Sequence, residues 1–342
     1  MSIDLLIRGG NVVFPGERVA AVDIGVVGGR IIALYEPGTA PAAKQEIDAT
    51  GLHVMPGVID PHQHLGIYND MAEDFREDTK VSAIGGITTV VNYYRANGSY
   101  HGTAPKVIAA GEENSLIDFA FSFGAITETH LAETESIIER YGVTSFKFYR
   151  NYQDVIKQLF GAEDALTLDA ADFIRTLQQL RDLSPKLLLC VHSEDMDIQR
   201  WAARKVKERG APESLAEFAT TSPDYAETAS VLSGIYLNQV VGGNLYIVHL
   251  TAGTSVEALE NSKWLTDNVV VETCVHYLAL DENAKAGLLA KVNPPIRTTR
   301  DQDALWRGTA NGTIRSIGTD NVPNGRARKL QKGKDMWSAA PG

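Results

Sequence analysis

Two patterns of apolar and polar positions divide the chain. Up to residue 53, short runs alternate apolar and polar residues without a helical period, and these runs cover residues 4–8, 11–14, 22–27 and 30–34. Such alternation is typical of strands with one buried face. The Gly28-Gly29 pair between the last two runs is typical of a two-residue hairpin turn. We therefore expect residues 1–53 to form the N-terminal part of a small β-sandwich domain.

After this segment, apolar runs alternate with helical patterns. The expected strands cover residues 53–59, 88–93, 119–125, 145–149, 187–192, 245–249, 269–274 and 316–318. Apolar residues recur at i, i+3 and i+4 over residues 130–141, 170–183, 197–208, 225–241 and 254–265, which indicates helices. Alternating strands and helices imply parallel strands. Eight such units predict an α/β fold, a (β/α)₈ TIM barrel over residues 54–342.

The alternative fold is an open doubly wound sheet. A sheet of that kind normally carries a glycine-rich turn that binds phosphate. The sequence contains neither G-x-G-x-x-G nor G-x-x-x-x-G-K-[ST], the two common forms of that turn. The closed barrel is therefore the favoured prediction.

The composition of the chain limits which partners and which cellular setting we expect. The 342-residue chain has a net charge of −11, which argues against a broad attraction to nucleic acid or to anionic membranes. No apolar run approaches the roughly 18 residues that suggest a membrane span. The N-terminus lacks the basic and long apolar parts of a signal peptide. The two cysteines, Cys190 and Cys274, both lie in apolar runs, so we expect buried thiols and a reducing, cytoplasmic setting.

Six potential metal ligands stand at the ends of five expected strands. They are His62, His64, Lys147, His192, His249 and Asp320. Catalytic groups of parallel barrels collect at the C-terminal ends of the strands. In an extended segment residues i and i+2 point the same way, so both imidazoles of His62-Gln63-His64 can converge on one ion. Each residue taken alone could have an ordinary role, such as a surface histidine or a helix cap. Potential ligands at the ends of five expected strands together predict a metal-dependent hydrolase.

Lys147 is the unusual member of this set. It is flanked by Phe146 and Phe148 on a strand expected to be central, and lysine is rarely fully buried unless it is paired. Burial lowers the pKa of an amine and makes it nucleophilic. Reaction with carbon dioxide would give a carbamate, whose two oxygens can bridge two cations. A lysine that extends its amine to solvent is the alternative, and the four histidines and the aspartate favour the bridge.

The combined pattern resembles the amidohydrolase superfamily, and locally the hydantoinase/dihydropyrimidinase group. Beyond the ligands, the resemblance is carried by residues 51–65, 85–89, 272–278, 294–297 and 312–320, and it extends over essentially all of the chain. It implies a hydrolase that acts on carbon–nitrogen bonds in cyclic amides. Chains of this family continue well past the last residue here, so we expect a barrel cut short after its eighth strand.

The resemblance implies a site with two divalent metal ions. One ion would be held by His62, His64 and Asp320, and the other by His192 and His249, with carboxylated Lys147 bridging both. Imidazole and carboxylate ligands suit zinc, and they would also accommodate manganese or iron. A hydroxide bridging the two ions would attack the ring carbonyl.

The same resemblance assigns the remaining catalytic roles. Asp320 would act as general base and then as general acid. Tyr152 would hold the substrate and stabilise the oxyanion, and Asn293 would contact the substrate through its backbone. The expected substrate is a small hydantoin or dihydropyrimidine, and the expected assembly is a homo-oligomer, a tetramer by resemblance.

Departures from the family pattern leave alternatives open. Asn321 stands where relatives commonly have histidine, and Asn293-Pro-Pro is closer to the dihydroorotase form of that loop. Gly66 stands where dihydroorotases carry an arginine for the substrate carboxylate, which disfavours dihydroorotate. The alternatives are an allantoinase-like or dihydroorotase-like hydrolase, a hydrolase of a linear amide or a xenobiotic, and a non-catalytic scaffold.

Overall fold

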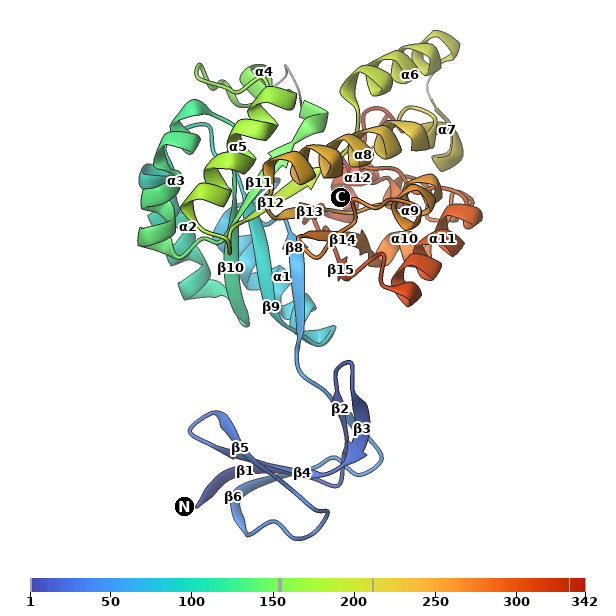
Figure 1. Ribbon diagram of the computed structural model, residues 1–342. Coiled ribbons are helices and arrows are strands. Elements are labelled where there is room, and N and C mark those ends of the chain that lie inside the picture. The colour runs from blue at the N-terminus through green and yellow to red at the C-terminus, as the bar shows by residue number, and fades with distance from the viewer. Residues whose placement is uncertain (1, 153–155, 211, 332, 342) are drawn as a thin grey trace. The chain divides into compact units, whose positions relative to one another are not determined.

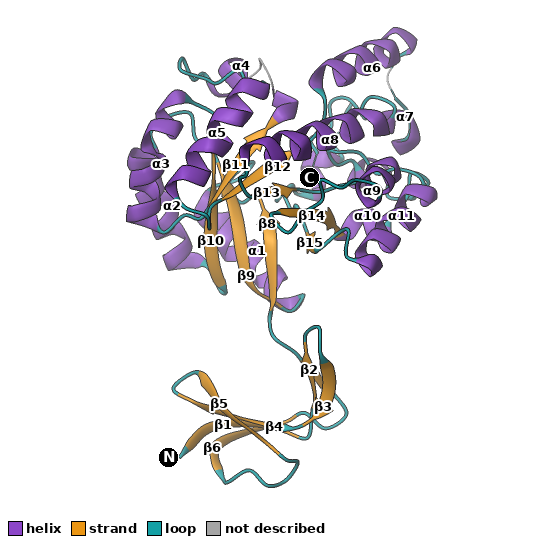
Figure 2. Cartoon of the chain, in the orientation of Figure 1, coloured by secondary structure: helices purple, strands orange, loops and turns teal. Residues whose placement is uncertain are grey.

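The computed structural model describes residues 2–152, 156–210, 212–331 and 333–341, except for the side chains of residues 159 and 160. The chain divides into two compact units, residues 1–58 and residues 59–342. Figure 1 traces the chain through both units, and Figure 2 shows that the first is built of strands and the second of alternating strands and helices.

The first unit consists of two small mixed sheets. Its strands are β1 (Ile3–Arg8), β2 (Asn11–Phe14), β3 (Arg18–Ala21), β4 (Asp23–Val27), β5 (Arg30–Tyr35), β6 (Ala43–Asp48) and β7 (His53–Val54). One sheet has the order β5-β4-β1-β6 and the other the order β3-β2-β7. Val27 pairs with Arg30 across the Gly28-Gly29 turn, as predicted for that hairpin. Both glycines have positive φ, as a two-residue hairpin turn of type I′ requires.

The second unit contains an eight-stranded parallel sheet that is almost closed into a barrel. Its strands are β8 (Val58–Gln63), β9 (Ile87–Tyr94), β10 (Asp118–Gly124), β11 (Ser145–Tyr149), β12 (Leu188–His192), β13 (Leu245–Ile247), β14 (Val269–Cys274) and β15 (Ser316–Gly318). They neighbour one another in chain order from β8 to β15. Gln63 and Asn321 form a parallel bridge across the remaining seam, where the His64 N–H donates to the Asn321 carbonyl at 2.8 Å. The predicted α/β barrel is confirmed.

Helices follow the barrel strands and surround them (Figure 2). They are α1 (Met71–Ile84), α2 (Tyr100–Asn114), α3 (Glu128–Tyr141), α4 (Ile156–Phe160), α5 (Ala170–Leu183), α6 (Met196–Arg209), α7 (Leu215–Ala219), α8 (Asp224–Val241), α9 (Gly253–Glu260), α10 (Val275–Ala279), α11 (Thr299–Asn311) and α12 (Arg326–Lys329), with short 3₁₀ turns η1 (Arg150–Tyr152) and η2 (Gly287–Ala290). In α5, Phe173, Leu177 and Leu180 recur at helical spacing and are buried, so the apolar stripe packs into the core.

Two expected elements were wrong in their limits. The first barrel strand was expected over residues 53–59, but His53 pairs with Asn11 in the small sheet and the barrel strand begins at Val58. Pro56 lacks an N–H donor, and Pro56-Gly57 separates the two strands. The helix expected over 254–265 ends at Glu260, where Asn261 caps it.

The main apolar core lies between the barrel strands and the helices, where Phe148 on β11 packs against Phe173 on α5 with ring centroids 5.7 Å apart. Phe123 and Leu189 belong to the same core and are fully buried. Cys190 and Cys274 are buried free thiols, as predicted. Within the described part of the chain, no helix is long and apolar enough to cross a membrane.

Candidate metal centre and active-site cavity

The seam of the barrel brings together potential metal ligands from its first and its last strand. His62 and His64 stand at the end of β8, and Asp320 lies two residues after β15. Asp60 holds this seam, because its carboxylate accepts hydrogen bonds from the Thr319 N–H at 3.0 Å and the Thr319 hydroxyl at 2.6 Å. Residues far apart in sequence are thereby fixed on one edge of the sheet.

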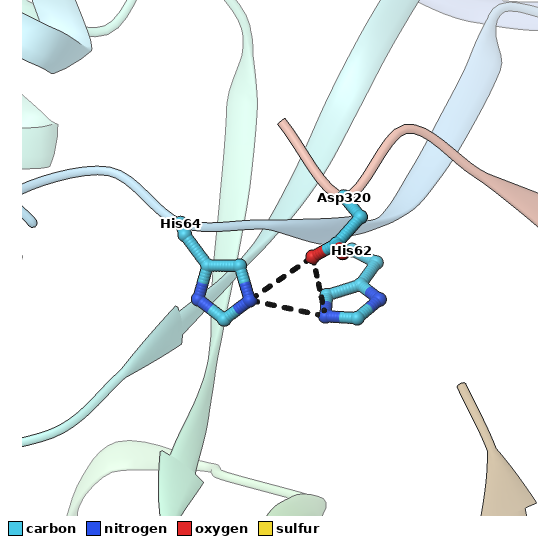
Figure 3. A group of neighbouring side chains, drawn as sticks. All are labelled: His62, His64 and Asp320. Atoms are coloured by element: carbon cyan, nitrogen blue, oxygen red, sulfur yellow. Dashed lines mark hydrogen bonds and ion pairs between the residues drawn. The ribbon is translucent and has the colours of Figure 1, made fainter. Parts of the chain in front are cut away.

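Three of these side chains converge on one point, as Figure 3 shows. Asp320 Oδ1 lies 3.2 Å from His62 Nε2 and 3.2 Å from His64 Nε2, and the two ring nitrogens are also 3.2 Å apart. His62 and His64 are buried and Asp320 is partly buried. Two imidazole nitrogens and a carboxylate oxygen in this arrangement form a candidate metal-binding group.

The other two predicted histidine ligands, His192 and His249, lie beside this group. The ring of His249 stacks against that of His62 with centroids 5.6 Å apart, and the ring of His192 meets His249 edge-on at 4.3 Å. His192 is the last residue of β12, and His249 follows β13 by two residues. The four imidazoles therefore form a continuous row across the mouth of the barrel.

Lys147 lies on β11 and is 1% exposed. Its Nζ has no hydrogen-bond partner among the described residues and lies 4.9 Å from the ring centroid of Tyr93 and 5.5 Å from that of Tyr149. Burial lowers the pKa of Lys147 to about 8, although Asp320 and other acidic groups oppose that shift. A buried amine without a partner is costly, so this position favours a modified or ligated lysine.

Burial also sets the charge of the neighbouring groups. It lowers the pKa of His64 to about 4 and that of His249 well below its ordinary value, so both rings are neutral at pH 7 and can donate a lone pair. Burial alone would raise the pKa of Asp320, but His62 and the other histidines hold it well below the usual range. Asp320 is therefore a carboxylate at neutral pH.

His249 and Asp320 share an uncommon backbone conformation. Their φ angles are 43° and 48°, in the left-handed region that non-glycine residues seldom adopt. Residues held in this region typically cost about 1–3 kcal/mol and cluster at functional sites. Both residues lie two positions beyond the end of a strand, β13 or β15, where the chain leaves the barrel wall.

A cavity of about 110 Å³ opens above these groups. Its walls include six of the predicted site residues: His64, Lys147, His192, His249, Asp320 and Tyr152, together with the predicted backbone contact Asn293. His62 lies beneath it, fully buried. Every residue predicted for the site is thus brought to one place, and none is left elsewhere in the fold. Their individual roles remain predictions.

Comparisons with known proteins decide the family. The chain is 31% identical to an allantoinase of Deinococcus radiodurans over 336 residues, covering 94% of this chain and 70% of that protein. It is 30% identical to a D-hydantoinase of Geobacillus stearothermophilus, covering 92% of this chain and 66% of that protein. The chain belongs to the hydantoinase, dihydropyrimidinase and allantoinase group of cyclic amidohydrolases.

The solved structures agree with this family. A D-hydantoinase from Bacillus sp. AR9 superposes with a TM-score of 0.84 at 29% identity, and the match covers 99% of this chain and 73% of that chain. No protein-family model matches the sequence. The expectation of an enzyme family that hydrolyses cyclic amides is confirmed.

The donor atoms fit the metal chemistry of a cyclic amidohydrolase. The unpartnered Lys147 amine and the neutral ring of His64 are both polar groups that burial would otherwise penalise. Nitrogen and carboxylate donors that meet at 3.2 Å suit a borderline divalent cation. The His62, His64 and Asp320 group is therefore a metal-site candidate of this family member.

Two buried glutamates that sequence analysis did not select orient the histidines. Glu272 Oε1 accepts from His62 Nδ1 at 2.9 Å and from the His249 N–H at 2.9 Å. Glu194 Oε2 accepts from His192 Nε2 at 2.5 Å, and Ser222 donates to the other oxygen. Each bond fixes one ring nitrogen as a donor and leaves the other for a ligand. The position of Glu272, a charged residue inside the apolar run Val269–Cys274, was a signal in the sequence that could have identified it.

Ser222 lies two residues before α8, which begins at Asp224. The N-cap is Pro223, and no side chain caps the helix. The Ser222 hydroxyl instead donates to Glu194, so it supports the candidate site rather than the helix.

Proposed function

We propose that this protein hydrolyses the ring amide bond of a small cyclic amide or imide of the hydantoin, dihydropyrimidine or allantoin type. The observation that carries the proposal is the gathering of four imidazoles, a buried lysine and an ionised aspartate around one cavity. Family membership supplies the reaction class, since the relatives are an allantoinase and a D-hydantoinase.

Two divalent ions, zinc or alternatively manganese or iron, complete the proposed site. When bound, they would polarise the ring carbonyl and lower the pKa of water. One ion would be held by His62, His64 and Asp320, and the other by His192 and His249, with carboxylated Lys147 supplying an oxygen to each. The row of rings and the unpartnered Lys147 amine support this division.

The chain's own residues would then guide the proton and the substrate. Asp320 accepts a proton from the attacking water and delivers it to the ring nitrogen. The water oxygen bonds to the carbonyl carbon, the ring C–N bond breaks, and one water is consumed for each ring opened. Tyr152 stabilises the negative charge on the carbonyl oxygen, and the Asn293 backbone contacts the substrate, since both residues line the cavity.

The substrate assay tests this proposal. Purified protein supplied with bicarbonate and zinc, manganese or iron should open at least one ring among hydantoin, dihydrouracil, allantoin and dihydroorotate. Asp320→Asn should lower kcat by at least about 100-fold, because the proton carrier is lost. The exposed His53→Gln variant is the control and should match the wild type.

The alternative is a non-catalytic scaffold. A protein that is folded, binds metal and opens none of these rings would contradict the cyclic amide proposal. A protein that binds no metal under the same conditions would support the scaffold.

A further inference from the structure

The cavity is lined by further polar and aromatic residues besides the ligand set. Arg95, Tyr68, Tyr149 and Tyr152 line it together with the metal-ligand candidates. No role for Arg95 follows from the ligand pattern or from the proposed hydrolysis. Arg95 places a permanent positive charge in a cavity of small-molecule size, so it affects which molecules can bind there.

The fold places Arg95 at the catalytic rim. It follows directly after β9, the strand beside β8, and β8 carries His62 and His64. Gly124 ends the neighbouring strand β10, and a Cβ added there would lie 3.4 Å from Arg95 Cβ and 3.3 Å from the Tyr100 hydroxyl. The absence of a side chain at position 124 therefore leaves room for the arginine stem.

Two tyrosines hold the guanidinium. The rings of Tyr149 and Tyr152 stack with centroids 5.2 Å apart, and Arg95 Cζ lies 5.6 Å and 6.0 Å from their centroids. Contacts of a guanidinium with aromatic rings are attractive and restrict its freedom. The arginine is therefore largely ordered before a ligand arrives, which reduces the entropy lost on binding.

The charge on Arg95 is retained in this setting. Burial works against the cation, but Tyr149 and Tyr152 keep the pKa of Arg95 above its ordinary value. An arginine side chain is effectively always protonated in proteins at neutral pH.

The cavity lining carries charges of both signs. Among its described lining residues, Asp320 is the one carboxylate, and it belongs to the candidate metal group. Arg95 contributes a cation that lies beside Tyr149 and Tyr152. A ligand that contacts both groups would present a carbonyl to the ligand set and a negative group to Arg95.

We propose that Arg95 binds a carboxylate on the ring of the substrate, so that the preferred substrates are small cyclic amides or imides with an anionic substituent. This inference rests on the proposed hydrolysis and names its substrate class. A guanidinium is planar and can donate two parallel hydrogen bonds to a carboxylate. The cavity of about 110 Å³ favours a single small ring with a short substituent.

Matched pairs of substrates test the inference. Dihydroorotate is dihydrouracil with a carboxylate, and hydantoin-5-acetate extends hydantoin in the same way. The wild type should prefer the acid of each pair by roughly 10- to 100-fold in kcat/KM, as expected for a charged hydrogen bond. Arg95→Gln should abolish this preference, chiefly by raising KM for the acid of each pair.

A second readout separates binding from turnover. Metal-stripped wild type should bind hydantoin-5-acetate more tightly than hydantoin in a calorimeter, and Arg95→Gln should lose that difference. Arg315→Gln removes the same charge from an exposed arginine that pairs with Asp267, and it should change neither readout.

The outcomes distinguish the two proposals. Hydrolysis of neutral rings without preference for acids would overturn the role of Arg95 and leave the proposed function intact. An equal loss of kcat on acid and neutral substrates in Arg95→Gln would show that Arg95 only positions Tyr152. If no ring is opened while the calorimetric preference persists, the anion site stands and the hydrolysis proposal fails.

Discussion

At the scale of single residues, the candidate site depends on burial changing the protonation of its members. Lys147 is buried without a described hydrogen-bond partner, and burial lowers its pKa to about 8. His64 is neutral at pH 7 for the same reason. Groups that are charged or exposed in a free peptide are thereby prepared to act as ligands.

The lowered pKa of Lys147 predicts how its carboxylation depends on pH. Carbon dioxide reacts with the neutral amine, and with a pKa of about 8 roughly one amine in ten is neutral at pH 7, against fewer than about one in a thousand for an ordinary lysine. At fixed dissolved carbon dioxide, the carboxylation rate of metal-free protein should rise about tenfold per pH unit up to about pH 7 and level off above pH 8. Carbon-13 NMR with labelled bicarbonate measures this rate.

The exposed Lys186 gives the comparison for this experiment. Its carboxylation should be negligible at neutral pH. A rate at Lys147 that keeps rising through pH 10 would contradict the proposed effect of burial.

At the scale of elements, β14 connects the strands that carry the ligands. Glu272 on β14 binds the ring of His62 on β8, the backbone of His249 and the hydroxyl of Tyr246 on β13. A Cβ added to Gly318 on β15 would lie 3.0 Å from the Glu272 carboxylate. The close approach of β15 to this carboxylate therefore favours a glycine there.

These contacts predict that the two glutamates act on different metal positions. Glu272→Gln should weaken the ion held by His62 and His64, and Glu194→Gln the ion held by His192, each by about 10- to 100-fold in affinity. Metal titration with competing chelators measures both affinities. The exposed Glu208→Gln on α6 is the control, and equal loss of both ions in both variants would contradict the assignment.

The sequence predicted most of the elements and the residues of the site, for a physical reason. Ligands follow buried strands, and parallel strands bring their ends to one rim, so local order along the chain determined which residues meet. Glu194, Glu272 and Arg95 could not be selected in this way. Their roles depend on which side chain faces which across the barrel, and a single charged residue near a strand end has many possible partners.

At the scale of the whole molecule, exposed aromatic side chains support the predicted homo-oligomer. Trp201 and Tyr225 are 47% and 49% exposed and line one groove of about 630 Å³. Exposed apolar surface of this kind often marks an interface between proteins. We therefore predict that light scattering finds a multiple of the chain mass.

Substitution of both aromatic residues tests that prediction. The Trp201→Glu and Tyr225→Glu pair should lower the oligomeric mass, because two charges would be buried in the interface. Val19→Glu changes an exposed apolar residue in the first unit and should leave the mass unchanged. A monomeric wild type would contradict the predicted assembly.

Metal content tests the central claim most directly. Wild type purified with bicarbonate and zinc should contain two ions per chain, together with a lysine adduct of the mass of carbon dioxide in native mass spectra. Lys147→Ala should lose both ions and the adduct while circular dichroism shows the barrel folded. A folded Lys147→Ala variant that retains two ions would contradict the bridging role of Lys147.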